Sequence, residues 1–221
     1  MQDKPIKKNL ARIFQYKMLG AQLAYLESIA GPAVHVNTDG TRDYEVDGCE
    51  VLVRSDGVSV VALRLFLNKE CTFDPGRFYE NRGNSSLSLP TANSTTFGIF
   101  ASRFGSPAQR GYPGIKFLTP CGLCGNSQIP WVYLYAQEGH AENWLEWLVG
   151  ADSNSQPTLN ATDRLMKTMI AREGRAYEFD TKFNCDMKYD KLAVEVLKNV
   201  KVAFMEIGHN IKPTDVMDCP N

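Results

Sequence analysis

Four residues have the types and the spacing that could hold a metal ion: Cys121, Cys124, His140 and Cys185. Zinc binds cysteine thiolates and histidine nitrogens, and a structural site closes a tetrahedral shell of four such ligands. Cys121 and Cys124 form a Cys-x-x-Cys pair, and His140 follows at a permissible spacing. Cys185 or His209 could complete the shell. A strong zinc signature has two cysteine pairs and this chain has one, so zinc is the alternative cofactor and no cofactor is the favoured expectation.

The same stretch contains the parts of a catalytic zinc site. In the zinc nucleobase deaminases, a His-x-Glu motif supplies one ligand and a proton-transferring carboxylate, and a Pro-Cys-x-x-Cys motif supplies two thiolates. Here Pro120 precedes the cysteine pair, and His140 is followed by Glu142. The order of the motifs is reversed, however, and no helical pattern follows Cys124. A zinc-dependent hydrolase or deaminase-like enzyme, with Glu142 as its proton shuttle, is therefore only the alternative function.

A Cys-x-x-Cys pair can also be a thioredoxin-like redox pair or a local disulfide. Redox chemistry needs the first cysteine at a helix N-terminus, which lowers the pKa of its thiol, but residues 125–130 (GNSQIP) predict a turn. A local disulfide, or two buried thiols in a glycine-rich turn, is the simpler interpretation. In an exported protein, all six cysteines are disulfide candidates: Cys49, Cys71, Cys121, Cys124, Cys185 and Cys219.

The composition is that of an ordinary globular protein. The 221 residues include 43% hydrophobic and 22% charged residues, with a formal net charge of -1. This balance provides no overall attraction to nucleic acid or to an anionic membrane. No apolar run is long enough for a transmembrane helix, and no charged-then-apolar leader is present. We expect a soluble protein, either cytoplasmic or exported to a periplasm or beyond, since the start MQDKP also resembles a mature exported chain.

The segment Arg42 to Leu67 predicts a long β-hairpin that organises the fold. Apolar residues alternate along both of its halves, as in strands with one buried face. The alternation slips by one residue at Gly48, which predicts a β-bulge there. A three-residue loop over 55–57, with Gly57 in the left-handed conformation, would keep the apolar residues on one face.

This loop fixes a predicted register. Val51 is expected opposite Val61, and Cys49 opposite Leu63. If a third strand runs beside the second, Cys71 lies two strands from Cys49 and cannot bond to it, whereas a chain that folds back beside the first strand would allow the disulfide.

An amphipathic helix from Pro5 to Ala30 is predicted to cover the apolar face of the hairpin. Gly31-Pro32 ends the helix, and Gly20 either divides it in two or weakens it. Three residues of its apolar side are predicted to be buried: Phe14, Leu23 and Leu26.

The remaining chain predicts a mixture of strands and helices. The expected elements are strands at 114–118 and 131–135, a helix over 141–149, a linker at 150–157, a helix from the N-cap Asn160 to Gly174, a helix over 189–199 and a last strand over 200–207. Trp131, Tyr133 and Tyr135 alternate along one strand and are candidates for a binding surface, although one face of an ordinary strand is the simpler explanation.

These patterns predict an α+β fold with a mainly antiparallel sheet built on the bulged hairpin at 42–67, covered by an N-terminal helix and followed by a C-terminal helix and strand portion. Residues 1–150 form the first portion and 151–221 a smaller α+β portion, packed on the same sheet or part of a single domain. The favoured function is a non-enzymatic binding or interaction protein, because no acid, base and nucleophile occur at recognisable spacing. The sequence does not identify its protein or small-molecule partner.

Overall fold

The computed structural model describes residues 7–79, 90–104, 116–118, 133–138, 145–152, 154–174 and 187–211. The chain divides into two compact units. Unit 1 comprises Met1–Thr95 and Ala203–Ile211, and unit 2 comprises Thr96–Val202 and Lys212–Asn221. The predicted division into residues 1–150 and 151–221 stays a prediction.

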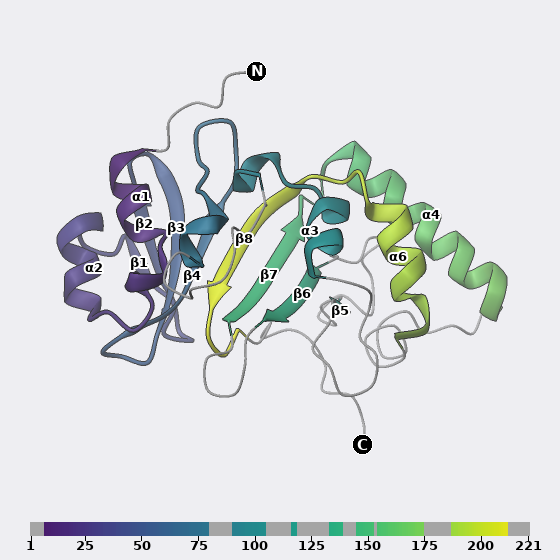
Figure 1. The fold of residues 1–221 in the computed structure, drawn as a ribbon. Helices are drawn as coiled ribbons and strands as arrows, with labels where there is room; N and C mark the ends of the chain where they lie inside the picture. Colours follow the sequence, from purple (N-terminus) through teal and green to yellow (C-terminus); the bar gives the residue numbers. More distant parts are fainter. Residues whose placement is uncertain are drawn as a thin grey trace. The chain divides into compact units, whose positions relative to one another are not determined.

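Unit 1 combines short helices with one antiparallel sheet (Figure 1). Its helices are α1 (Lys8–Ile13) and α2 (Leu23–Ala30), with single 3₁₀ turns at Tyr16–Met18, Pro75–Phe78 and Ala92–Ser94. Its strands are β1 (His35–Val36), β2 (Arg42–Val46), β3 (Cys49–Ser55), β4 (Val60–Phe66) and β8 (Val202–Gly208). They follow the order β1-β2-β3-β4-β8, and each is antiparallel to its neighbours. An α+β fold with an antiparallel sheet is therefore confirmed.

The segment predicted as one N-terminal helix forms α1, a 3₁₀ turn and α2. Gly20 precedes α2 with a φ of 81°, and Gly31 follows it with a φ of 84°, a left-handed conformation that glycine adopts without steric cost. At the first break, the N–H of Gly20 donates to the carbonyl of Val60, which ties the helical segment to β4. The three residues predicted to be buried are all buried: Phe14, Leu23 and Leu26.

The predicted bulge at Gly48 is wrong, because Asp47 and Gly48 form a two-residue turn between β2 and β3. Val46 and Cys49 face each other across it. Asp47 has a φ of 52° and Gly48 a φ of 75°, and positive φ at both positions is typical of a type I′ turn, for which Asp-Gly is a preferred sequence. Two residues that flank such a turn lie on the same face of the sheet, which accounts for the slip in the alternation.

The register predicted for the second hairpin is also wrong. Val51 lies opposite Leu65, and Leu63 lies opposite Val53. Val61, which was expected opposite Val51, is skipped by the pairing and is the extra residue of a β-bulge. The loop spans residues 56–59 instead of 55–57, so one bulge is present but sits in the second strand of this pair.

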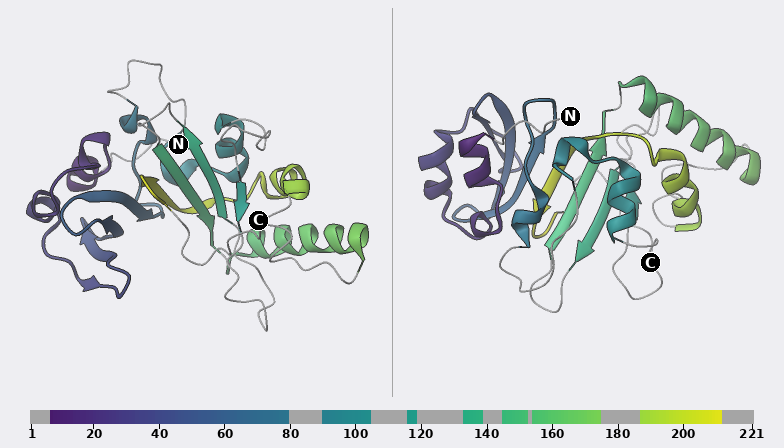
Figure 2. Two further views of the ribbon diagram at one scale, coloured as in Figure 1. Left: turned by 90° about the horizontal axis from the view of Figure 1, so that it is seen from below. Right: turned by 45° about the horizontal axis from the view of Figure 1, so that its top comes forward.

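Unit 2 combines strands β5 (Lys116–Leu118), β6 (Tyr133–Glu138) and β7 (Leu145–Ala151) with helices α3 (Phe97–Phe104), α4 (Gln156–Glu173) and α6 (Asp190–Leu197) (Figure 2). β6 lies between β5 and β7 and is antiparallel to both. α6 contacts α3 and α4. The strands predicted near 114–118 and 131–135, the helix near 189–199 and the last strand are thus confirmed within the described residues.

β7 replaces the helix predicted over 141–149. The five consecutive residues from Trp147 to Ala151 are all buried, as is Leu145 at the start of the strand. A strand that is buried on both faces has a continuous apolar run without alternation, and such a run cannot be told from a buried helix by its periodicity. The sequence pattern was therefore ambiguous at this point.

α4 begins earlier than predicted. Its N-cap is Ser155, whose side chain accepts a hydrogen bond from the N–H of Thr158, and not Asn160. The start of α4 and the end of β7 therefore occupy much of the predicted linker at 150–157. The predicted end at Gly174 is confirmed, with a φ of 82°.

Candidate functional site

The sheet of unit 1 has two chemically different faces, because successive side chains of a strand point to opposite sides. One face is mostly apolar and buried, with the half-buried Arg42 opposite Val53 at its edge. Its buried residues are Tyr44, Val46, Cys49, Val51, Val53, Leu63, Leu65, Met205 and Ile207. The opposite side carries a group of residues from β3, β4 and β8 that we call the polar face: Leu52, Arg54, Arg64, Phe66, Phe204 and Glu206. The polar face is the candidate functional site.

Glu206 is the centre of the polar face. Its side chain is completely buried and forms ion pairs with two arginines. Arg54 Nε lies 2.5 Å from Glu206 Oε1, while Arg64 donates to Oε2 from Nε at 2.9 Å and from Nη2 at 2.5 Å. A buried carboxylate is tolerated only when charged partners replace its lost hydration, so the two arginines are what permits Glu206 to lie there.

Small residues allow Arg54 to reach Glu206 across β4. Arg54 lies opposite Ala62, and Ala62 lies opposite Gly208 on β8. A Cβ atom at Gly208 would come within 2.3 Å of the carbonyl oxygen of Val61, the bulged residue. The close approach of β4 therefore requires glycine at position 208. Ala62 and Gly208 have small side chains or none, so they leave room for the long side chain of Arg54.

Aromatic rings flank the charged cluster. The guanidinium of Arg64 lies over the ring of Phe204, 4.5 Å from its centroid. The rings of Phe66 and Phe204, which face each other across β4 and β8, have centroids 6.1 Å apart. The stacking fixes the orientation of Arg64, while Phe66 and Leu52 are half-buried and offer apolar surface beside it.

The positive charge of the cluster extends to the loop between β1 and β2. The pKa of Asp39 lies below its ordinary value, chiefly because the hydroxyl and N–H of Thr41 donate to its carboxylate, and to a smaller extent because of the charge of Arg54. Arginine does not lose its proton in proteins. The polar face is therefore suited to binding an anionic group and not to proton transfer by its arginines.

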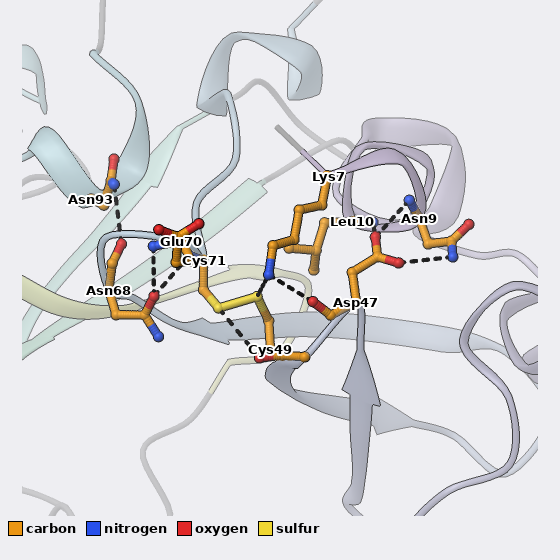
Figure 3. Close-up of a disulfide and its surroundings, with 10 residues drawn as sticks. Lys7, Asn9, Leu10, Asp47, Cys49, Asn68, Glu70, Cys71 and Asn93 are labelled. Atoms are coloured by element: carbon orange, nitrogen blue, oxygen red, sulfur yellow. Dashed lines mark hydrogen bonds between the residues drawn. A yellow bond between two sulfur atoms is a disulfide. The ribbon is translucent and has the colours of Figure 1, made fainter. Parts of the chain in front are cut away.

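A second cluster lies where β2 turns into β3 (Figure 3). Cys49 and Cys71, two of the six disulfide candidates, form a disulfide with their Cα atoms 5.6 Å apart. The observed register explains why these two cysteines lie close together. With Val51 opposite Leu65, Cys49 lies beside the end of β4. The chain then turns at Asn68, whose N–H donates to the carbonyl of Cys71.

Asp47 connects this corner to α1. Its carboxylate accepts hydrogen bonds from the N–H groups of Asn9 and Leu10, at 2.8 and 3.2 Å, and so caps the start of the helix (Figure 3). Lys7 Nζ donates to the carbonyl of Asp47 and lies 3.8 Å from Cys49 Sγ. Because both cysteines are only 1% exposed, this disulfide corner is shielded from reductants and serves as a structural clamp.

Most site residues proposed from the sequence lie outside the described residues: Cys121, Cys124, Trp131, His140, Glu142, Cys185 and Cys219. Of the other two binding-surface candidates, Tyr133 begins β6, and Tyr135 is half-buried between the fully buried Leu134 and Ala136. In the part of the chain that the structure describes, no group of three or more histidine, cysteine, aspartate or glutamate side chains could hold a metal ion. The zinc hypothesis stays a prediction, and metal analysis of protein purified without chelator would test it.

Arg54, Arg64 and Glu206 were not predicted from the sequence as site residues. One signal was available, since Glu206 is the single charged residue in the apolar strand VAFMEIG, and a carboxylate in such a strand requires a cationic partner. The two partners could not be identified from sequence, because Arg54 and Arg64 come from strands far away in the chain and their pairing depends on the register.

Comparison of the chain with protein-family models, with curated proteins and with solved structures found no match. No helix among the described residues is both long enough and apolar enough to span a membrane.

Proposed function

We propose that the protein is a non-enzymatic binding or interaction protein and that its ligand binds on the polar face of unit 1. The observation that carries the proposal is the pair of arginines around Glu206. The side chains of Arg54 and Arg64 are each 18% exposed, whereas that of Glu206 is fully buried. The arginine Nε atoms are directed at a buried carboxylate, so each guanidinium is held in place while its side chain stays partly exposed. A binding site held rigid in this way loses little conformational entropy when the ligand arrives.

The residue types of the polar face support the same proposal. Arginine and aromatic side chains are enriched where proteins bind partners, because they combine apolar contact area with directed hydrogen bonds. Here Arg64 is stacked on Phe204, and Phe66 and Leu52 lie half-buried next to it. The proposal assigns these half-buried residues to contact with the ligand.

We also propose that the protein works in an oxidising compartment, such as a periplasm or the extracellular space. The supporting observation is the Cys49–Cys71 disulfide, since disulfides persist in such compartments and are rare in the cytosol. Thiol counting on protein taken from its native compartment, under denaturing and non-reducing conditions, tests this. Free thiols at both Cys49 and Cys71 would contradict it.

The test of the binding face is a nuclear magnetic resonance screen of the isotopically labelled full chain with a mixed library of small molecules and short peptides. We expect the resonances that shift to group on Leu52, Arg54, Arg64 and Phe66. Phe66→Ala should then weaken the hits, while Ile99→Ala, which shortens an exposed apolar residue of α3 in unit 2, should not. Hits that group elsewhere would contradict the assignment of the binding face.

A further inference from the structure

We infer that the group recognised by the polar face is a single carboxylate attached to an apolar or aromatic group. This inference rests on the proposed function, because it names the chemical class of ligand for the same site. It is carried by the hydrogen-bond donors that the two arginines leave unused, by the excess of one positive charge within their ion-paired cluster with Glu206 and by the apolar residues beside them.

Both arginines have unused hydrogen-bond donors, because Glu206 accepts from only some of the N–H groups of each guanidinium. Arg54 uses Nε alone, and Arg64 uses Nε and Nη2. Among the described residues, neither Nη atom of Arg54 nor Nη1 of Arg64 donates a hydrogen bond. The Nη1 and Nη2 groups of arginine can donate two parallel hydrogen bonds to the two oxygens of a carboxylate. Both groups of Arg54 are unused, so Arg54 can bind a carboxylate in a bidentate manner.

The charges favour an anion that carries one negative charge. Arg54 and Arg64 together exceed Glu206 by one positive charge. Asp39 lies near Arg54, whose charge contributes to lowering its pKa. Three further acidic residues lie on the same side of β2 and β3, since Asp43 is opposite Leu52 and Glu45 is opposite Glu50. A carboxylate adds a single negative charge beside these residues, whereas they would repel a dianionic phosphate more strongly.

The apolar part of the ligand is inferred from Phe66 and Leu52. Leu52 faces Arg64 directly across β3 and β4, and Phe66 is the next residue on the same face of β4. Both are half-buried. An aromatic or aliphatic group next to the carboxylate would cover them and release the water that they order.

The test measures the affinity of the full chain for N-acetylphenylalanine and for its amide, which lacks the charge, by chemical-shift titration. We expect the acid to bind at the polar face and the amide to bind about tenfold more weakly or worse, because hydrogen bonds to a charged group are lost. Benzoate is titrated in parallel: tighter binding of benzoate indicates a free organic acid as the ligand, and tighter binding of N-acetylphenylalanine indicates a peptide C-terminus.

Two variants with opposite expected effects on the affinity sharpen this test. Arg54→Met removes the unused donor edge while Arg64 still pairs with Glu206, and should weaken binding of the acid about tenfold or more. Asp39→Asn keeps the oxygen that accepts from Thr41 but removes the competing charge, and should strengthen binding. Arg172→Met, which removes an exposed arginine of α4 in unit 2, is the matched control and should leave the affinity unchanged.

Equal affinity for the acid and the amide, or an acid affinity that Arg54→Met leaves unchanged, would overturn the inference. The proposed function would survive that result if other library compounds still shift Leu52, Arg64 and Phe66. It would fail separately if no compound shifts these residues. Circular dichroism and urea unfolding of each variant identify a loss of binding that comes from a loss of folding.

Discussion

The two faces of the unit 1 sheet are built by alternate residues of the same strands, yet they differ in what completes them. The apolar face is completed from within the chain: Tyr44 donates a hydrogen bond to Glu27 of α2, the disulfide clamps Cys49, and Asp47 caps α1. On the polar face, the arginines pair with Glu206 and leave further Nη donors without a hydrogen bond among the described residues. This difference supports the proposal that one face supplies stability and the other supplies recognition.

Truncation of Leu65 is expected to have the largest effect on stability. Leu65 is fully buried on the apolar face, so Leu65→Ala loses transfer free energy and leaves a cavity, at a cost of about 2–5 kcal/mol in the free energy of unfolding. Leu52→Ala removes the same atoms from a half-buried position on the polar face of the neighbouring strand and should cost about 1 kcal/mol or less. Urea unfolding measures both. Equal costs would erase the difference between the faces.

Loss of the disulfide is the next largest effect. Cys49 and Cys71 are separated by 22 positions, and a cross-link of this length stabilises the folded state by about 3 kcal/mol, mainly by restricting the unfolded chain. Cys71→Ala alone should cost as much as Cys49→Ala with Cys71→Ala, because either change abolishes the bond. A double variant as stable as the wild type would show that the apolar face does not depend on this clamp.

The cap on α1 should contribute less. Asp47→Gly removes the carboxylate that accepts from Asn9 and Leu10 but keeps the left-handed backbone free of strain, and should cost about 1 kcal/mol. Asp47→Ala also forces a residue with a Cβ atom into a φ of 52°, which adds about 1 kcal/mol or more. Thermal unfolding of the two variants separates the cap from the turn. If Asp47→Gly were neutral, the contact between turn and helix would carry no stability.

The last predicted effect is a pH dependence that appears only in alkaline solution. Burial first, and then the charge and hydrogen bond of Glu27, raise the pKa of Tyr44 from 10.0 to about 12. A raised pKa means that folding favours the neutral phenol, so this contribution to stability is complete below pH 10 and is lost as the pH rises from 10 to about 12. Unfolding curves across this range should fall less steeply with pH for Tyr44→Phe. An unchanged slope would show that Tyr44 ionises as freely in the folded state as in the unfolded chain.

The fold class could be predicted because it depends on local patterns. The alternation over Arg42 to Leu67 indicated strands, and Gly20 and Gly31 marked the helix ends. The register could not be predicted from apolar alternation alone, since the turn at Asp47 and Gly48 and the bulge at Val61 each shift the pairing. The Asp-Gly dipeptide was a usable signal for the first shift, and no comparable signal marks the second.

The candidate site depends on the register and was therefore out of reach. Arg54 and Arg64 resemble ordinary solvent-facing residues of a half-buried sheet until β8 is placed beside β4. Glu206 alone carried information, because its apolar neighbours in β8 predict burial. Sequence reasoning can thus indicate that a buried carboxylate needs a partner, but only the topology identifies which residues provide it.

Adjacent residues of β4 offer the most direct test of a division between a stabilising face and a binding face. Leu65 lies on the apolar face and Phe66 on the polar face. The affinity for N-acetylphenylalanine is measured for Leu65→Ala and Phe66→Ala at a temperature where both variants are folded. Our account predicts that Phe66→Ala weakens binding and that Leu65→Ala binds like the wild type despite its lower stability. Unchanged affinity in Phe66→Ala, or an equal loss in both variants, would contradict it.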